Sequence, residues 1–234
     1  MFPIDIDFSR IKEVLTYDPQ APMIFSSGIF LWLFTAFLVV YVLLQHKHTA
    51  RILFVTLFSY YFYYKSSGTY FFLLALVTVC DFFLAQLMAR AEGYWKRKGL
   101  VVLSLSVNLG LLAYFKYTNF ILQTLRLPKV SVLPAPVGVS FLTFLLISYL
   151  ADVYRGRIPA ETRFSRFFLY ALYFPKAAQG PLCRYGDFSA QLDGCTQDAA
   201  LPDEGVSRLI LGLGKKVLLS GAAGAVAKDA FGLP

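Results

Sequence analysis

The feature that most constrains this chain is the apolar run of residues 24–44, which contains no charged residue in 21 positions. A helix of that length rises about 30 Å, which is the thickness of a bilayer's hydrocarbon core. Further apolar runs follow at 52–64, 69–88, 100–115 and 137–151. Only 15% of the residues are charged, whereas a soluble domain has about a quarter. The pattern predicts an all-α, polytopic transmembrane protein.

The chain divides into a polar segment, residues 1–22, and a transmembrane domain, residues 23–234. The first segment carries more acidic than basic residues, unlike the start of a signal peptide, and the first apolar run begins only near Met23. We therefore expect this run to remain as a membrane anchor. Residues 164–174 are too short to span and are expected to be tilted or re-entrant, and residues 205–227 are expected to form a last helix. Residues 116–127 either lie in the interface or continue the helix before them.

The net charge of +8 is spread over the short breaks between apolar runs. This distribution is typical of membrane topology and headgroup attraction, so membrane lipid is the expected partner and nucleic acid is not. With the N-terminus outside, the inside breaks hold ten Lys and Arg residues and the outside segments hold six. The bias predicts an N-terminus outside the cytoplasmic membrane.

Three polar residues lie within or beside the apolar runs. Asp81 and Asn108 fall in mid-run, where a carboxylate is costly and marks either a functional site, as in a transporter or flippase, or a hydrogen bond between helices. Asp152 follows the run 137–151 and is expected to anchor a helix end at the interface. A structural role in the membrane is therefore predicted for all three.

Motifs for common chemistries are absent from the sequence. His46 and His48 flank Lys47, do not share a helix face, and are interpreted as solvated loop residues. The three cysteines form no C-x-x-C pair, so no metal site is predicted. No G-x-S-x-G, H-E-x-x-H or P-loop string occurs. The residues alone therefore predict a polytopic membrane protein with a polar segment from Pro175 to about Asp203.

Five strings add a resemblance to this reading: MIFSSGIFLWLF, SYYFYYKSSG, WKRKGLVVLSLSVNLGLLAYFKYTNF, PVGVSFLTFLLISYLADVYRG and FPKAAQGPLCRYGDFSAQL. In order and spacing they resemble the membrane-bound O-acyltransferase family, and most closely its bacterial branch of alginate O-acetyltransferases. The resemblance covers nearly the whole chain but about the N-terminal half of a typical member. The family's catalytic histidine lies in a W-H-I-S-type motif that does not occur here, so the catalytic residue of this chain is unknown.

The resemblance implies a partial ring of tilted helices in the inner membrane. It also implies transfer of an acyl group, commonly acetyl, from an acyl thioester such as acetyl-CoA to a hydroxyl of a cell-surface polysaccharide or carrier. The donor would be a substrate, and no bound cofactor is expected. A periplasmic or secreted acyltransferase partner is also implied. A non-catalytic membrane scaffold is the main alternative, beside the transporter or flippase.

Within the resemblance, the segment FPKAAQGPLCRYGDF is the expected lining of a polar interior. Arg184 is a candidate to bind a phosphate or carboxylate of donor or acceptor, and Asp187 to orient Arg184 or cap a helix. Tyr185 is a further substrate-binding candidate, and Gly180 and Pro181 would set a turn. The alternative is an interfacial loop whose Arg and Asp pair with each other or with headgroups. Compared with the family's usual strings, the chain departs at Leu142, Leu145, Lys176 and Gln179.

Overall fold

The structure, a computed structural model, describes residues 16–18, 23, 25, 27–44, 46–128, 130, 135–177, 182–194 and 202–232. It confirms the all-α class, and these residues contain no strand. The α-helices are α2 (Gly28–Leu43), α3 (His48–Ser67), α4 (Tyr70–Arg90), α5 (Tyr94–Leu112), α6 (Thr118–Thr124), α7 (Val139–Tyr154), α8 (Phe164–Leu172), α9 (Tyr185–Gly194), α10 (Pro202–Gly214) and α11 (Gly221–Phe231). Two π-helical segments, η1 (Ala113–Tyr117) and η3 (Lys215–Ser220), and the short 3₁₀ helix η2 (Phe174–Lys176) lie between them.

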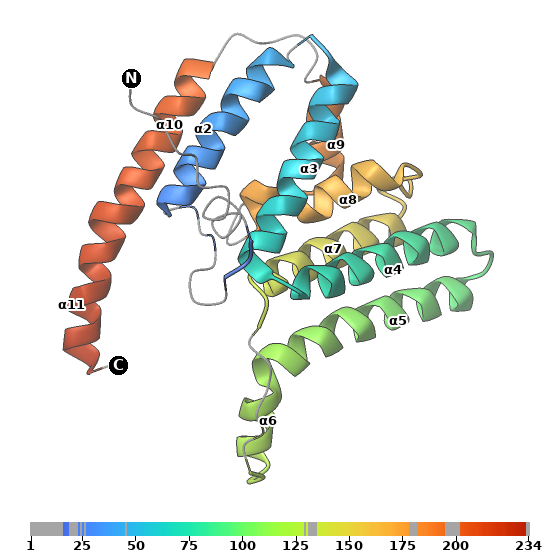
Figure 1. Cartoon of the computed structure of the whole chain (residues 1–234). Coiled ribbons are helices and arrows are strands. Elements are labelled where there is room, and N and C mark those ends of the chain that lie inside the picture. The colour runs from blue at the N-terminus through green and yellow to red at the C-terminus, as the bar shows by residue number, and fades with distance from the viewer. Residues whose placement is uncertain are drawn as a thin grey trace, which may run out of the picture.

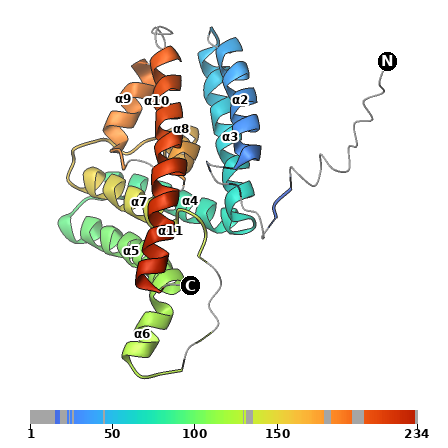
Figure 2. The same ribbon diagram turned by 90° about the vertical axis from the view of Figure 1, so that its left-hand side faces the viewer.

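Most of the helices fall into two groups, and helix α3 of the first group contacts α4, α8 and η2 (Figure 1). Helices α2 and α3 stand side by side, and α4, α5 and α7 pack on one another at a steep angle to that pair (Figures 1 and 2). Phenylalanine rings join the groups, since Phe174 of η2 lies with its ring centroid 5.3 Å from that of Phe37 and 5.0 Å from that of Phe58. Aromatic packing therefore fixes η2 against the α2–α3 pair.

Several helices are long and apolar enough to cross a membrane: Tyr70–Arg90, Tyr94–Thr124 and Ser207–Phe231. Two shorter apolar helices, α2 and α7, accompany them. The protein is thus a membrane protein, as its apolar runs predict. The short run 52–64 belongs to a 20-residue helix, α3, whose first turns include the polar residues His48 and Arg51.

Helix α5 continues through η1 into α6, so residues 118–124 extend the preceding helix, which was one of the two alternatives that the sequence left open. The axis bends at η1 (Figure 1). A π-helical turn is a recognised cause of such kinks because it interrupts the regular i→i−4 hydrogen bonds.

The last helix predicted over 205–227 corresponds to the rod formed by α10, η3 and α11, which crosses in front of the other helices in Figure 2. Its apolar window is not buried against the rest of the described chain. Large apolar side chains lie exposed along it: Ile210, Leu211, Leu218, Leu219, Val226 and Phe231. Residues 1–22, predicted to be extracytoplasmic, lie outside the described residues except for 16–18.

The start of α7 is in direct contact with the residue that follows η2. Gly138, at the N-terminus of α7, has φ +78°, a conformation that favours glycine. A Cβ atom at this position would lie 1.8 Å from the carbonyl oxygen of Ala177. Only glycine therefore allows α7 to begin this close to η2.

We expect Gly138→Ala to destabilise the protein by about 2 kcal/mol or more, because the new methyl group meets both backbone strain and a clash. Thermal unfolding in detergent, followed by size-exclusion chromatography, measures this effect. Gly99→Ala is the matched control, since Gly99 lies within α5 with no atom near its Cβ position. Equal melting temperatures for the two variants would contradict the role given to Gly138.

Candidate functional site

A cluster of polar side chains joins α4 to α5 in the interior. Ser104 Oγ donates a hydrogen bond to Asp81 Oδ1 at 2.7 Å, and Asn108 Nδ2 donates one to Asp81 Oδ2 at 2.7 Å. All three residues are buried. Each oxygen of the Asp81 carboxylate thus accepts a hydrogen bond from the neighbouring helix. Of the two roles that the sequence left open for Asp81, this arrangement favours a structural role between helices over a role in transport. Asp152, near the end of α7, instead pairs with Arg157 at 3.4 Å.

We expect Asn108→Leu to lower the stability of the protein by about 1–2 kcal/mol, because the buried Asp81 Oδ2 loses its hydrogen-bond donor. Thermal unfolding in detergent measures the loss. Ser106→Ala is the control, since Ser106 lies on the exposed side of the same helix. If both variants have the melting temperature of the wild type, the polar cluster does not contribute to holding α4 against α5.

A second polar junction centres on Glu161, in the loop between α7 and α8. The Tyr185 hydroxyl donates a hydrogen bond to the Glu161 carboxylate, and the Glu161 backbone N–H donates one to the Tyr149 hydroxyl at 2.9 Å. Gln86 Nε2 donates to the Glu161 carbonyl oxygen at 3.4 Å. One loop residue therefore connects α4, α7 and α9. The sequence analysis missed Glu161, and the only available signal was an acidic residue within a basic loop.

Of the site residues predicted in α9, Tyr185 is buried in this junction. Its burial, reinforced by the Glu161 carboxylate, raises the pKa of Tyr185, so the hydroxyl keeps its proton and remains a donor. Its ring packs on that of Tyr170, with 5.0 Å between ring centroids. The structure therefore gives Tyr185 a role in positioning α9.

Arg184 and Asp187, by contrast, lie on the surface at the start of α9. Asp187 falls in the first turn, where the helix dipole favours a negative charge. In the part of the chain that the structure describes, no ion pair joins it to Arg184. Gly180 and Pro181, predicted to form a turn, lie outside the described residues.

We expect Tyr185→Phe to lower stability by about 1–3 kcal/mol, because the partly buried Glu161 carboxylate loses a hydrogen-bond donor. Thermal unfolding checks this, with Tyr117→Phe on the exposed side of η1 as the control. An unchanged melting temperature for Tyr185→Phe would show that α9 is held by its ring packing alone.

A cavity of about 490 Å³ lies between α2, α3, α8, η2 and α9. This volume is in the range of small-molecule sites. Both ends of the predicted lining segment reach it, through Lys176 on one side and Cys183 on the other. The described residues that line it are Phe37, Leu38, Tyr41, His48, Arg51, Ile52, Val55, Leu169, Tyr173, Pro175, Lys176, Cys183, Phe188, Gln191 and Leu192. We call it the α2–α9 cavity.

Lys176 is buried in aromatic surroundings beside this cavity. Its Nζ atom lies 4.4 Å from the ring centroid of Tyr170 and 4.2 Å from that of Phe188, distances typical of cation–π contacts. Burial lowers the pKa of Lys176, and the neighbouring Cys183 thiol opposes this shift. No oxygen atom of the described residues accepts a hydrogen bond from Nζ. The ammonium group is therefore held mainly by aromatic rings.

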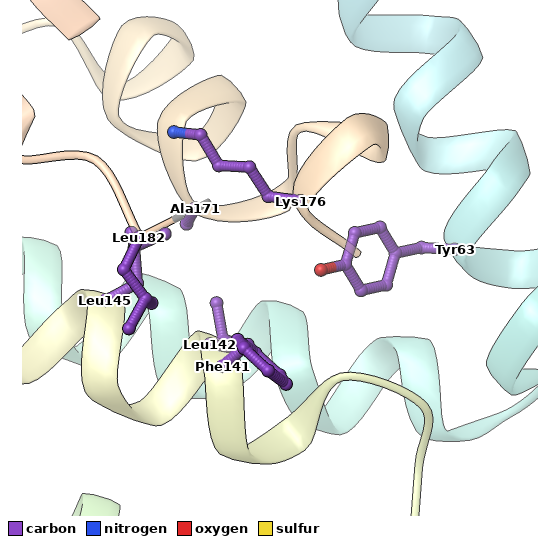
Figure 3. Close-up of a pocket in the computed structure, with 7 residues that line it drawn as sticks. All are labelled: Tyr63, Phe141, Leu142, Leu145, Ala171, Lys176 and Leu182. Atoms are coloured by element: carbon purple, nitrogen blue, oxygen red, sulfur yellow. The ribbon is translucent and has the colours of Figure 1, made fainter. Parts of the chain in front are cut away.

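A much smaller pocket of about 10 Å³ lies on the other side of the Lys176 stem, as Figure 3 shows. The Tyr63 hydroxyl points into it, and the Lys176 amino group points away. Leu142 and Leu145 of α7 line the same pocket. Three of the departures from the family's usual strings, Leu142, Leu145 and Lys176, thus meet at one place. The leucines and the lysine stem make this part of the interior apolar and nearly closed.

No family model matches the chain, and no solved structure matches it. It is 33% identical over 227 residues to the probable alginate O-acetylase AlgI of Pseudomonas aeruginosa and 32% identical over 222 residues to that of Pseudomonas putida. These alignments cover 90% of this chain but 42% and 45% of the relatives. A peptidoglycan O-acetyltransferase of Helicobacter pylori is 29% identical over 168 residues, 59% of this chain and 32% of that protein.

The chain therefore spans less than half the length of these curated relatives. The alignments to the alginate O-acetylases nevertheless extend over both helix groups and the segment between η2 and α9, because they leave only a tenth of the chain unmatched. Across nine tenths of its length, this chain is related to the alginate O-acetylases, the branch of the membrane-bound O-acyltransferase family that its sequence strings resemble.

Proposed function

We propose that this chain is part of a membrane-bound O-acyltransferase that transfers an acyl group, in the first place acetyl, to hydroxyl groups of a cell-surface polysaccharide or carrier. The observation that carries the proposal is the similarity over nine tenths of the chain to proteins named as alginate O-acetylases. The additional similarity to a peptidoglycan O-acetyltransferase supports O-acetylation as the shared reaction.

The proposed reaction consumes an acyl thioester such as acetyl-CoA. The acceptor hydroxyl oxygen attacks the thioester carbonyl carbon, a C–O bond forms as the C–S bond breaks, and the hydroxyl proton passes to a general base. The thiolate leaves and takes up a proton. We assign no residue of this chain as the base: His46 is exposed, and His48 Nε2 lies 3.3 Å from the Leu192 carbonyl oxygen.

Arg184 is the proposed contact for a phosphate or carboxylate of donor or acceptor. Its exposed position at the start of α9, beside the α2–α9 cavity residue Cys183, supports this role. A planar guanidinium group binds such anions with two parallel hydrogen bonds. Asp187 and Tyr185 follow in the same helix, and in this proposal Tyr185 positions α9 through Glu161.

We further propose that the protein lies in the cytoplasmic membrane with its N-terminus outside, and that a periplasmic or secreted acyltransferase completes the transfer. The excess of basic residues in the inside breaks supports the orientation. The transporter or flippase alternative was based on Asp81 and Asn108 in mid-run. It is disfavoured because these side chains form hydrogen bonds with each other and with Ser104. A scaffold is disfavoured by the enzyme names of the relatives.

The test is deletion of the full gene in its host, followed by measurement of ester-linked acetyl groups on the surface polysaccharide by proton NMR. We expect the acetyl signal to disappear and to return when the intact gene is supplied. Unchanged acetylation in the deletion strain would overturn the proposed function.

Complementation with Arg184→Gln is expected to restore about a tenth of the acetylation or less, because one charge-assisted anion contact is lost. Arg90→Gln, which removes an exposed charge at the end of α4, is the control and should restore full acetylation. If both variants restore it equally, Arg184 has no part in substrate binding, although the function itself would stand.

A further inference from the structure

Two loops that are far apart in the sequence lie at the same end of the group formed by α4, α5 and α7, on the right in Figure 1. The first loop joins α4 to α5, and the second joins α7 to α8. Arg97, in the first turn of α5, donates a hydrogen bond from Nη2 to the Tyr154 carbonyl oxygen at 2.9 Å. Gln86 of α4 donates one to the Glu161 carbonyl oxygen at 3.4 Å. The two loops and the helix ends beside them therefore form one surface.

Basic side chains predominate on this surface, residues 90–98 and 152–163, which we call the basic face. The structure describes both ranges completely. They contain seven Lys and Arg residues and three acidic residues, an excess of four positive charges. Six of the basic residues are exposed: Arg90, Lys96, Lys98, Arg155, Arg157 and Arg163. Such a surface attracts anions, because the fields of its charges add.

The carboxylates of the basic face do little to reduce its exposed charge. Asp152 is buried and pairs with Arg157 at 3.4 Å. Glu161 is partly buried, and its carboxylate accepts a hydrogen bond from the Tyr185 hydroxyl. Of the three acidic residues in the face, only Glu92 is exposed. The exposed charge of the face is therefore predominantly positive.

Aromatic and then apolar side chains continue from the basic face along α4 and α5. Trp95 and Tyr94 are 77% and 60% exposed in the first turn of α5, and Lys98 Nζ lies 5.3 Å from the Trp95 ring centroid. Phe83 and Val102 lie exposed further along the two helices, both of which are long and apolar enough to cross a membrane. This order of side chains is typical of a protein surface that passes from phospholipid headgroups into hydrocarbon.

We propose that the basic face binds the headgroups of anionic phospholipids in the membrane leaflet that it meets. The phosphates lie against exposed Lys and Arg side chains of both loops, and Tyr94 and Trp95 lie at the boundary with the acyl chains. An acidic soluble protein would match the charge but not the exposed Trp and apolar helix surfaces beside it, so a lipid surface fits the face better. This inference is independent of the acyltransferase proposal, because it requires neither a donor nor an acceptor hydroxyl.

The test is native mass spectrometry of the purified full-length protein in detergent, titrated with phosphatidylglycerol, which is anionic, or phosphatidylcholine, which is zwitterionic. We expect phosphatidylglycerol to bind at least about tenfold more tightly, because each Lys or Arg near anionic lipid contributes about fivefold in affinity. Raising the ammonium acetate concentration about tenfold should reduce this preference, since exposed charges are screened by salt.

Two double variants test whether the two loops act as one surface. Lys96→Gln combined with Lys98→Gln removes two charges from the start of α5, and Arg155→Gln combined with Arg163→Gln removes two from the loop after α7. Each pair should weaken phosphatidylglycerol binding by about 25-fold and leave phosphatidylcholine binding unchanged. All four side chains are exposed, so both variants should remain folded, and their melting temperatures without added lipid check this.

Lys116→Gln combined with Arg126→Gln is the matched control. It removes the same number of exposed charges, but near the other end of the long helix that α5, η1 and α6 form, away from the basic face (Figure 1). This variant should bind phosphatidylglycerol as the wild type does.

Equal affinity for the two lipids would overturn the proposal, and so would a loss in the control as large as in the two test variants. An effect of only one test variant would contradict a single face built from both loops. Displacement of phosphatidylglycerol by millimolar inorganic phosphate would show a site for free anions and would also contradict a lipid surface, whereas retention of the lipid supports it.

Discussion

The close approach of Gly138 to the carbonyl group of Ala177 is the constraint on which the junction of the two helix groups depends. It brings the start of α7 against the end of η2, and η2 carries both Phe174 and Lys176. Phe174 packs on the rings of α2 and α3, so the same short segment touches both groups. The Lys176 ammonium group lies on this same segment, so its position depends on the close approach of Gly138 and on the packing of Phe174.

Lys176 separates two environments. Its stem completes a small apolar pocket with Leu142 and Leu145, and its amino group lies among the rings that border the larger cavity. A buried cation held by aromatic rings keeps part of its attraction for an anion, because ring quadrupoles are weaker partners than a carboxylate.

Buried and partly buried carboxylates in this protein are each met by hydrogen-bond donors from other parts of the chain. Asp81 receives hydrogen bonds from Ser104 and Asn108, and Glu161 receives one from Tyr185. The Asp81 junction joins the consecutive helices α4 and α5, and the Glu161 junction joins α4, α7 and α9. Each junction reduces the penalty that a carboxylate without a donor would carry. These junctions explain how a chain rich in apolar residues reaches one specific packing, since apolar contacts alone distinguish poorly between helix registers.

The sequence by itself determined the membrane class, the all-α fold and the relationship to O-acyltransferases, because apolar run length and short motifs are local properties. It also singled out Asp81, Asn108 and Tyr185 by residue type. Only the tertiary structure decided their partners and revealed Glu161, the clustering of His48, Arg51 and Lys176, and the surface position of Arg184. Those features depend on groups from different helices and loops, such as His48 of α3 and Leu192 of α9, which are 144 residues apart and share no local pattern.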